Sequence, residues 1–264
     1  MPAGLVVTLD GDVHGLDEPL VRVTDPVLTH GDGVFETTLV RGGRACLLEA
    51  HLSRLADSAR IAALPAVDLA LFRTAAATAV SRWAGDDAVL RLVYGRGAAF
   101  AAISPVPDRV AAARRDGVAA VTLDRGPDGP LHAAKSLSYA DNAAALREAA
   151  RRGAGDAIYV CAGGLVLEGP RSSVVIAEGE TLISPPATPA ILPGTTVRAL
   201  FQTAPRVVYR PLTVADLFAA QGVWLLSAVT LAARVHTLDG VALPTAPLAA
   251  QLAEWVDTAV GRES

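Results

Sequence analysis

The chain has 264 residues, of which 52% are hydrophobic, and this is enough for one large domain or two smaller ones with their own cores. A net charge of −4 argues against nucleic-acid binding, and the sequence has no apolar run long enough to predict a membrane span. The N-terminus lacks the charged and apolar regions of a signal peptide, so we expect a cytoplasmic protein that binds neither nucleic acid nor membrane.

The first part of the chain combines strands, in which apolar and polar residues alternate, with helices, in which apolar residues recur every three or four positions. In chain order the expected elements are a strand with a hairpin (4–11), a strand (34–40), a turn (41–44), a helix from residue 48, a second helix (67–85) and a strand (87–97).

The local amino-acid composition changes near the middle of the chain. The segment SPVPDR has two prolines that disfavour regular structure. We therefore expect a linker at about 107–116, between an N-terminal α/β domain (1–106) and a C-terminal domain (117–264). The elements predicted after it are a strand (117–124), a loop (125–130), a helix (139–153), short strands (156–184), a helix after Gly194, strands (222–240) and a final helix (246–261). The fold class is α+β.

The two cysteines and five histidines show no metal-binding pattern. Cys46 and Cys161 are isolated, and the histidines lack spacings such as HExxH that place two ligands on one helix face. We expect no metal, and two small buried thiols in a reducing compartment.

Lys135 is the only lysine among 23 lysine and arginine residues. If the composition simply disfavours lysine, Lys135 could be a solvated surface residue without a function. The alternative is chemistry, because the guanidinium of arginine stays protonated, whereas a lysine amine forms Schiff bases with aldehydes and ketones. The neighbouring sequence has to decide between the two.

A Schiff-base lysine that serves pyridoxal phosphate needs an anion site for the phosphate and an acid facing the pyridine nitrogen. In ILPGTTVRAL, Gly194, Thr195 and Thr196 stand at the predicted start of a helix, where free N–H groups favour anions. Ser227 ends a second apolar strand and is another phosphate candidate. Glu168 ends the apolar run GLVLE and is the candidate acid. Taken singly, each is more common as a turn or cap residue.

Five motifs occur in one order along residues 6–240. They are HGDGVFETTLVRGGRACLLEAHLSRLADSA, KSLSYADN, LEGPRSSVVI, ILPGTT and VHTLDG. Together they resemble the class-IV pyridoxal-phosphate enzymes, which include branched-chain aminotransferases, D-amino-acid aminotransferases and 4-amino-4-deoxychorismate lyases. The resemblance implies a two-domain fold of type IV, pyridoxal 5′-phosphate as cofactor, a small-molecule substrate and a homodimer.

The resemblance also implies roles for individual residues. Lys135 matches the Schiff-base lysine, Arg54 the arginine that binds the cofactor phosphate, and Tyr139 the tyrosine at the ring hydroxyl. Glu168 matches the acid at the ring nitrogen, and Gly194–Thr196 the phosphate loop.

Three positions depart from the family pattern. Ser138 and Ser173 stand where asparagine is common, and Val197 replaces an arginine that often follows the phosphate loop. These departures affect secondary contacts and leave the Schiff-base lysine in place.

Three further features of the sequence bear on the choice of family member. No arginine or histidine follows Gly97 in YGRGAAFAAIS, although D-amino-acid enzymes have an Arg-x-His carboxylate trap there. Thr37 stands where branched-chain enzymes have glycine and is similar to the lyases, and Arg91 is a candidate carboxylate contact. The resemblance therefore implies a lyase that releases pyruvate from aminodeoxychorismate to give 4-aminobenzoate for folate. The alternative is a class-IV aminotransferase for branched-chain or D-amino acids. A non-catalytic binding protein on the same scaffold would not need the lysine.

Overall fold

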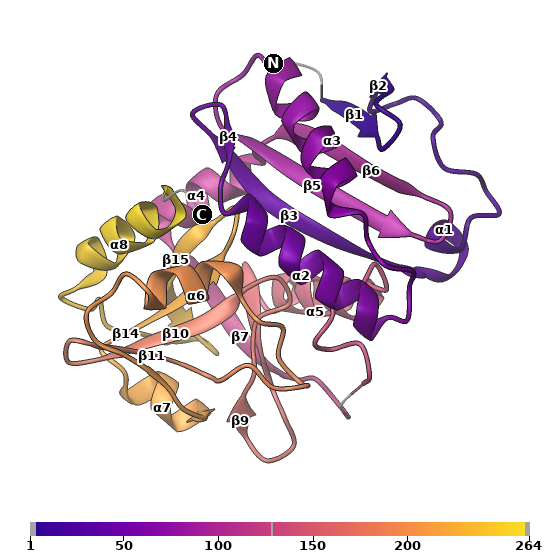
Figure 1. The fold of residues 1–264 in the computed structure, drawn as a ribbon. Helices are drawn as coiled ribbons and strands as arrows, with labels where there is room; N and C mark the ends of the chain where they lie inside the picture. The colour runs from indigo at the N-terminus through magenta and orange to yellow at the C-terminus, as the bar shows by residue number, and fades with distance from the viewer. Residues whose placement is uncertain (1–3, 128, 262–264) are drawn as a thin grey trace. The chain divides into compact units, whose positions relative to one another are not determined.

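The computed structural model describes residues 4–127 and 129–261 and divides the chain into two compact units. The first unit contains the chain up to Pro107 together with Ala133–Tyr139. The second contains Asp108–His132 and Ala140–Gly261. Both combine sheets with helices, so the expected α+β class is confirmed (Figure 1).

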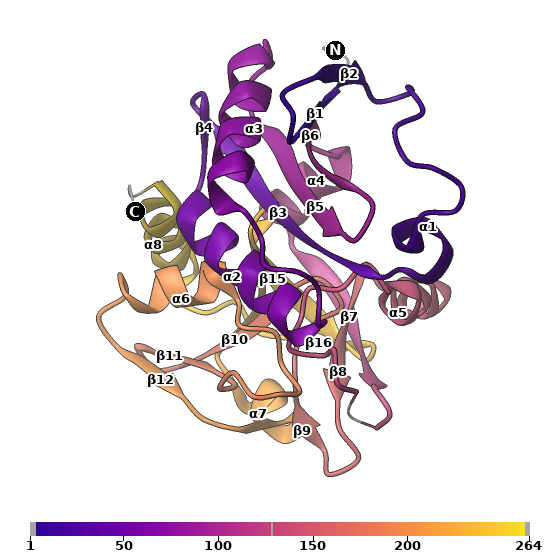
Figure 2. The ribbon, with the colours of Figure 1, turned by 45° about the vertical axis from the view of Figure 1, so that its right-hand side comes forward.

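The first unit is an antiparallel sheet covered by helices. Its described strands follow the order β2-β1-β6-β5-β3-β4. Helices α2 and α3 lie across one face of this sheet (Figures 1 and 2). The elements are β1 (Leu5–Thr8), β2 (Val13–Gly15), α1 (Pro26–His30), β3 (Gly33–Arg41), β4 (Arg44–Ala45), α2 (Leu48–Ile61), α3 (Leu69–Arg82), β5 (Ala88–Gly95) and β6 (Ala99–Pro105).

The core of the first unit lies between the sheet and these two helices. Side chains alternate across a strand, so Val34 and Val40 on β3 point to the same face. They pack with Leu52 and Leu55 of α2 and with Phe72 of α3, and all five are at most 1% exposed. Burial of apolar surface, worth ~25 cal/mol per Å², makes this layer a source of stability for the unit.

The lysine segment belongs to the first unit, although it lies about a hundred residues after β3 in the chain. The Phe35 N–H donates to the Lys135 carbonyl (2.9 Å), and the Leu137 N–H donates to the Gly33 carbonyl (2.8 Å). Strand β4 pairs only with Val40 and Arg41, so the first half of β3 has an edge at which the lysine segment can pair. The backbone of Lys135 is thereby held against β3.

The second unit is built on a mixed sheet, with described strands in the order β12-β11-β10-β14-β15-β7-β8-β9-β13 and β16 beside β15. Strand β7 pairs in parallel with both β15 and β8. The elements are α4 (Asp108–Asp116), β7 (Val118–Asp124), α5 (Ala140–Arg151), β8 (Asp156–Val160), β9 (Leu165–Val166), β10 (Ser173–Glu178), β11 (Thr181–Ser184), α6 (Thr195–Phe201), β12 (Val207–Tyr209), β13 (Leu212–Thr213), α7 (Val214–Ala219), β14 (Gly222–Ser227), β15 (Leu231–Leu238), β16 (Val241–Ala242) and α8 (Ala249–Gly261).

The structure differs from the sequence-based expectation at the domain boundary. Most of the segment expected as a linker, 107–116, is helix α4 of the second unit. The two prolines precede this helix rather than interrupt it, and Asp108 in its first turn and Arg114 and Arg115 in its last suit the helix dipole. The chain also returns to the first unit at 133–139, which a single boundary cannot describe.

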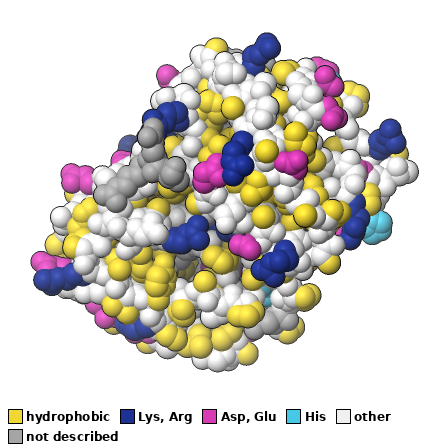
Figure 3. All heavy atoms as spheres, viewed as in Figure 1, with side chains coloured by type: hydrophobic (Ala, Val, Ile, Leu, Met, Phe, Trp, Pro, Cys, Tyr) yellow, Lys and Arg dark blue, Asp and Glu magenta, His cyan; other side chains and the backbone are white. Residues whose placement is uncertain are grey.

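The surface carries both signs of charge. On the face shown in Figure 3, basic and acidic side chains are interspersed. Within the described residues, no helix is long and apolar enough to cross a membrane.

Candidate active site

In the first unit, the side chains around Phe35 bring together four of the predicted site residues. The Lys135 Nζ lies 4.6 Å from the centroid of the Phe35 ring, and the Arg91 guanidinium carbon lies 4.2 Å from it. The Tyr139 ring packs edge-on against the same ring, and the two ring centroids are 5.9 Å apart. Thr37 is paired directly with Arg91 between β3 and β5. The structure therefore gathers a primary amine, a guanidinium, a phenol and a hydroxyl on one side of β3.

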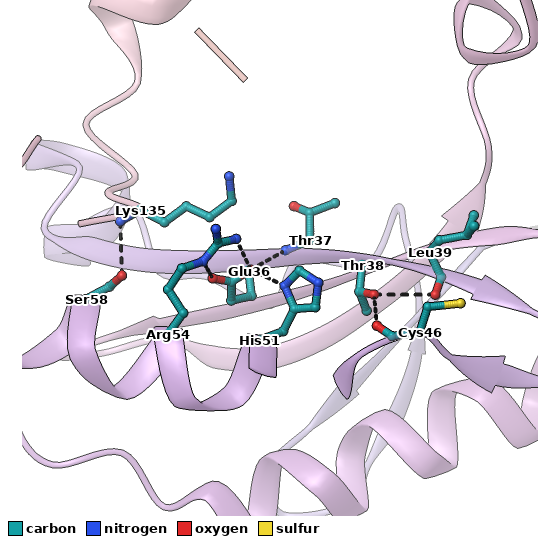
Figure 4. Close-up of polar contacts among 9 residues, drawn as sticks. All are labelled: Glu36, Thr37, Thr38, Leu39, Cys46, His51, Arg54, Ser58 and Lys135. Carbon is teal, nitrogen blue, oxygen red and sulfur yellow. Dashed lines mark hydrogen bonds and ion pairs between the residues drawn. The ribbon is translucent and has the colours of Figure 1, made fainter. Parts of the chain in front are cut away.

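Arg54 lies on helix α2 within a row of polar residues. His51, Arg54 and Ser58 recur at spacings of three and four, beside the apolar row that packs in the core. Ser58 Oγ accepts a hydrogen bond from the Lys135 N–H (3.1 Å), while His51 and Arg54 both reach Glu36 (Figure 4). One face of α2 thus connects the lysine segment to the middle of β3.

Glu36 is a fully buried carboxylate at the centre of this row. Its Oε1 accepts from Arg54 Nε at 2.6 Å, and its Oε2 accepts from Arg54 Nη2 at 2.9 Å and from His51 Nδ1 at 2.6 Å. The Thr37 N–H also donates to Oε2 (3.2 Å). A carboxylate only accepts, so His51 carries its proton on Nδ1. Removing one partner from a buried ion pair costs about 3–5 kcal/mol, because the other charge is left unpaired.

Burial and charge act in opposite directions on this cluster. Burial by itself raises the pKa of Glu36, but the charge of Arg54 and the contacts from His51 outweigh it and hold that pKa far below its ordinary value. Burial lowers the pKa of His51, and the hydrogen bond to Glu36 offsets this only in part. The cluster is therefore an ionised glutamate between a guanidinium and a neutral imidazole.

In the second unit, Glu168 lies against the loop that carries the phosphate candidates. Both of its carboxylate oxygens are 3.3 Å from the Leu192 N–H, three residues before Thr195. Arg125 Nη1 lies 3.5 Å from Glu168 Oε1, and the two side chains are 8% and 15% exposed. The structure thus places the predicted ring-nitrogen acid beside the predicted phosphate loop, and it adds an arginine that the sequence did not suggest.

The loop before α6 has features that suit a phosphate. A Cβ on Gly194 would lie 2.3 Å from the Ser173 hydroxyl, so any larger residue there would displace that hydroxyl. Thr195 and Thr196 are 4% and 3% exposed, and the Thr196 hydroxyl is buried without a hydrogen-bond partner. An unsatisfied buried hydroxyl is costly unless a ligand completes it, so these residues fit the phosphate of the cofactor. Val197, which replaces the arginine common in the family, is buried, with 4% of its surface exposed.

Ser227 ends β14, whose Leu226 pairs with Ser173 on β10. Its Oγ accepts from the Thr230 N–H (3.1 Å). Ser227 also lines a cavity of about 420 Å³ within the second unit, together with Ser172 and His236. Its assignment to the cofactor phosphate stays a prediction.

The sequence interpretation missed Glu36, His51, Phe35 and Arg125. Glu36 could have been recognised because it lies on the core-facing side of its predicted strand, and buried charges are rare unless they are paired. The spacing of His51 and Arg54 on one helix face was the signal for its partners. Arg125 follows a strand as a common loop residue, and no sequence pattern singled it out.

The profile of the amino-transferase class IV family matches residues 33–238. This chain belongs to that family. This membership confirms a pyridoxal-phosphate enzyme with a fold of type IV.

Three proteins that resemble this class-IV enzyme match it over nearly the whole of both chains. The bifunctional aminodeoxychorismate lyase / D-amino acid transaminase of Mycobacterium tuberculosis is 52% identical over 97% of this chain and 99% of its own. A solved M. tuberculosis structure, described as a hypothetical aminotransferase in its PLP-bound form, matches with a TM-score of 0.93 at 52% identity, covering 98% of this chain and 99% of its own. A fold-IV transaminase from Curtobacterium pusillum matches with a TM-score of 0.90 at 35% identity over 96% of each chain.

Proposed function

We propose that this enzyme is an aminodeoxychorismate lyase, which releases pyruvate from 4-amino-4-deoxychorismate and yields 4-aminobenzoate for folate in the cytoplasm. The observation that carries the proposal is the grouping around Phe35, where an amine and a guanidinium lie against one ring. Support also comes from the mycobacterial relative, whose name includes this lyase.

The first unit supplies the reactive amine and two groups that bind the cofactor. Lys135 is the Schiff-base residue, Arg54 binds the cofactor phosphate, and Tyr139 contacts the ring hydroxyl. In the second unit, Glu168 faces the ring nitrogen, and Gly194–Thr196 and Ser227 bind phosphate. When bound, the cofactor supplies an aldehyde for the substrate amine and a ring that withdraws electrons.

The other groups act on the substrate. Arg91 holds a substrate carboxylate through charge-assisted hydrogen bonds, and Thr37, opposite it in the sheet, orients the ring. Lys135 Nζ, once neutral, takes the proton from the ring carbon that carries the amine. It then returns a proton to the departing three-carbon group, which leaves as pyruvate. Aromatisation of the ring drives the reaction, and no second amino acceptor is consumed.

The alternative is transamination of D-amino acids, because the name of the same relative includes that activity. The deciding experiment supplies aminodeoxychorismate to the purified enzyme without any 2-oxo acid and follows 4-aminobenzoate and pyruvate. Repeated turnover, with the two products in equal amounts, supports the lyase. No product, together with one round of amino transfer from a D-amino acid that stops until a 2-oxo acid is added, supports the transaminase.

A further inference from the structure

The contacts of Arg54 carry an inference about how the phosphate site of the first unit is built. Arg54 and Glu36 stand on different elements, α2 and β3, and both are in the middle of their element. The carboxylate takes one whole edge of the guanidinium, through Nε and Nη2. Because a guanidinium is planar, fixing one edge fixes the direction of its remaining N–H groups.

We propose that Glu36 is a positioning residue, which holds the guanidinium of Arg54 in the orientation that binds the phosphate monoester of the cofactor, and that His51 fixes the carboxylate in turn. The inference rests on the phosphate role proposed for Arg54. It assigns to Glu36 and His51 a function that acts through Arg54 and involves no contact with the reacting atoms.

If only charge mattered, Glu36 would weaken the binding of phosphate by Arg54. A buried carboxylate 2.6 Å from the guanidinium neutralises it and repels a phosphate, which carries close to two negative charges. Preorganisation instead predicts that Glu36 strengthens phosphate binding, since an arginine already fixed in place loses little side-chain entropy on binding. The sign of the change in affinity therefore separates a positioning role from a purely electrostatic one.

The surroundings of Glu36 favour the positioning role. Four donors reach its two oxygens, from Arg54, His51 and the Thr37 backbone, so its carboxylate has one well-defined orientation. Glu36 and His51 are 0% and 1% exposed, so neither exchanges its partners with water. Groups held on a helix and a strand are placed more accurately than groups on loops.

The unit also contains a matched control. Glu49 and Arg73 form the same two-bond fork at 2.7 Å, but both side chains are 46% exposed. Glu49→Gln removes an equal charge from a similar fork, between α2 and α3, and does not touch the buried cluster. This variant should leave the affinity for cofactor within about twofold of the parent.

The test is a titration of cofactor-free protein with pyridoxal phosphate and, separately, with pyridoxal, which lacks the phosphate. Glu36→Gln should weaken pyridoxal phosphate binding by about 10-fold or more, the effect of a lost charge-assisted contact, and should change pyridoxal binding by less than about twofold. In an Arg54→Met background, Glu36→Gln should add no further loss. Unchanged or tighter binding of pyridoxal phosphate by Glu36→Gln would overturn the proposal.

A second variant covers the case in which Glu36→Gln does not fold. Glu36→Asp keeps the charge and withdraws the carboxylate from Arg54 by one methylene, so the phosphate-dependent part of the affinity should still fall. An aspartate variant that retains the parental ratio of pyridoxal phosphate to pyridoxal affinity contradicts the positioning role. If Arg54→Met also leaves that ratio unchanged, the phosphate assignment of Arg54 itself fails. The titrations use no aminodeoxychorismate, so they are independent of which reaction the enzyme catalyses.

Discussion

Lys135 is the residue on which the proposed chemistry depends, and the chain has no second lysine to replace it. Lys135→Ala and Lys135→Arg should both lose turnover, since neither supplies a nucleophilic amine, while the thermal unfolding temperature stays close to the parent value. Arg60→Ala, at an exposed position of α2, is the control for loss of a cation and should remain active. Borohydride reduction and peptide mass spectrometry should place the cofactor mass on Lys135. Attachment at another residue would contradict the assignment.

Arg91 is expected to act on the substrate and not on the cofactor. Arg91→Leu should raise the KM for aminodeoxychorismate by about 10- to 100-fold, which corresponds to one lost charge-assisted contact, and should leave pyridoxal phosphate affinity unchanged. Arg96→Leu removes a guanidinium from the turn just after the same strand and serves as the matched control. Steady-state kinetics and a cofactor titration on both variants check this. An equal rise in KM for the two variants would contradict a specific contact between Arg91 and the substrate.

The site residues differ in how far the sequence could predict them. Lys135 and Glu168 could be predicted because family motifs surround them, and the structure shows Glu168 beside the expected phosphate loop. Glu36 could not be identified in the same way. Its partners His51 and Arg54 lie 15 and 18 residues away in the chain, and only the packing of α2 on β3 shows that all three side chains meet.

At the scale of single elements, the pairing of β3 with α2 should make stability depend on pH. The pKa values of Glu36 and His51 are both lowered in the folded protein. A lowered folded-state pKa gives stability that is present above the unfolded-state pKa and is lost as pH falls. The loss should begin below about pH 6.5 through His51 and deepen below about pH 4.3 through Glu36, with a slope of about 1.4 kcal/mol per pH unit for each proton.

His51→Asn isolates the imidazole contribution, because the asparagine amide takes the place of Nδ1 as a donor to Glu36 but does not titrate. Denaturant unfolding between pH 7 and pH 5 should therefore show a shallower loss of stability in this variant than in the parent. Identical pH profiles for the two proteins would show that His51 is not buried in its neutral form.

Regular elements were predictable where one periodicity dominates, and less so elsewhere. Strand β3 and helix α2 follow from alternation and from helical spacing. Strand β6 is rich in alanine and has no clear alternation, so only its pairing with β5 and β1 defines it. Helix α4 follows two prolines, which mask it when the sequence is read locally.

At the scale of the whole molecule, the resemblance implies a homodimer, and this stays a prediction. Val23 and Leu28 in the first unit are 80% and 62% exposed, and we expect the subunit contact to cover them. Light scattering at micromolar concentration should give twice the chain mass of 27.1 kDa. A fully active species of 27.1 kDa would contradict the prediction.

The backbone pairing of Phe35 with Lys135 has a consequence for how the protein is made. The two residues are about a hundred positions apart, so at a synthesis rate of about 5–20 residues per second strand β3 emerges roughly 5–20 s before its lysine partner. During that interval the edge at Phe35 has no Lys135 segment to pair with, and the nascent chain is more exposed to strand-to-strand association there. The Lys135 segment joins its sheet late, so a truncated product that stops before residue 135 carries the strand without the amine proposed to react.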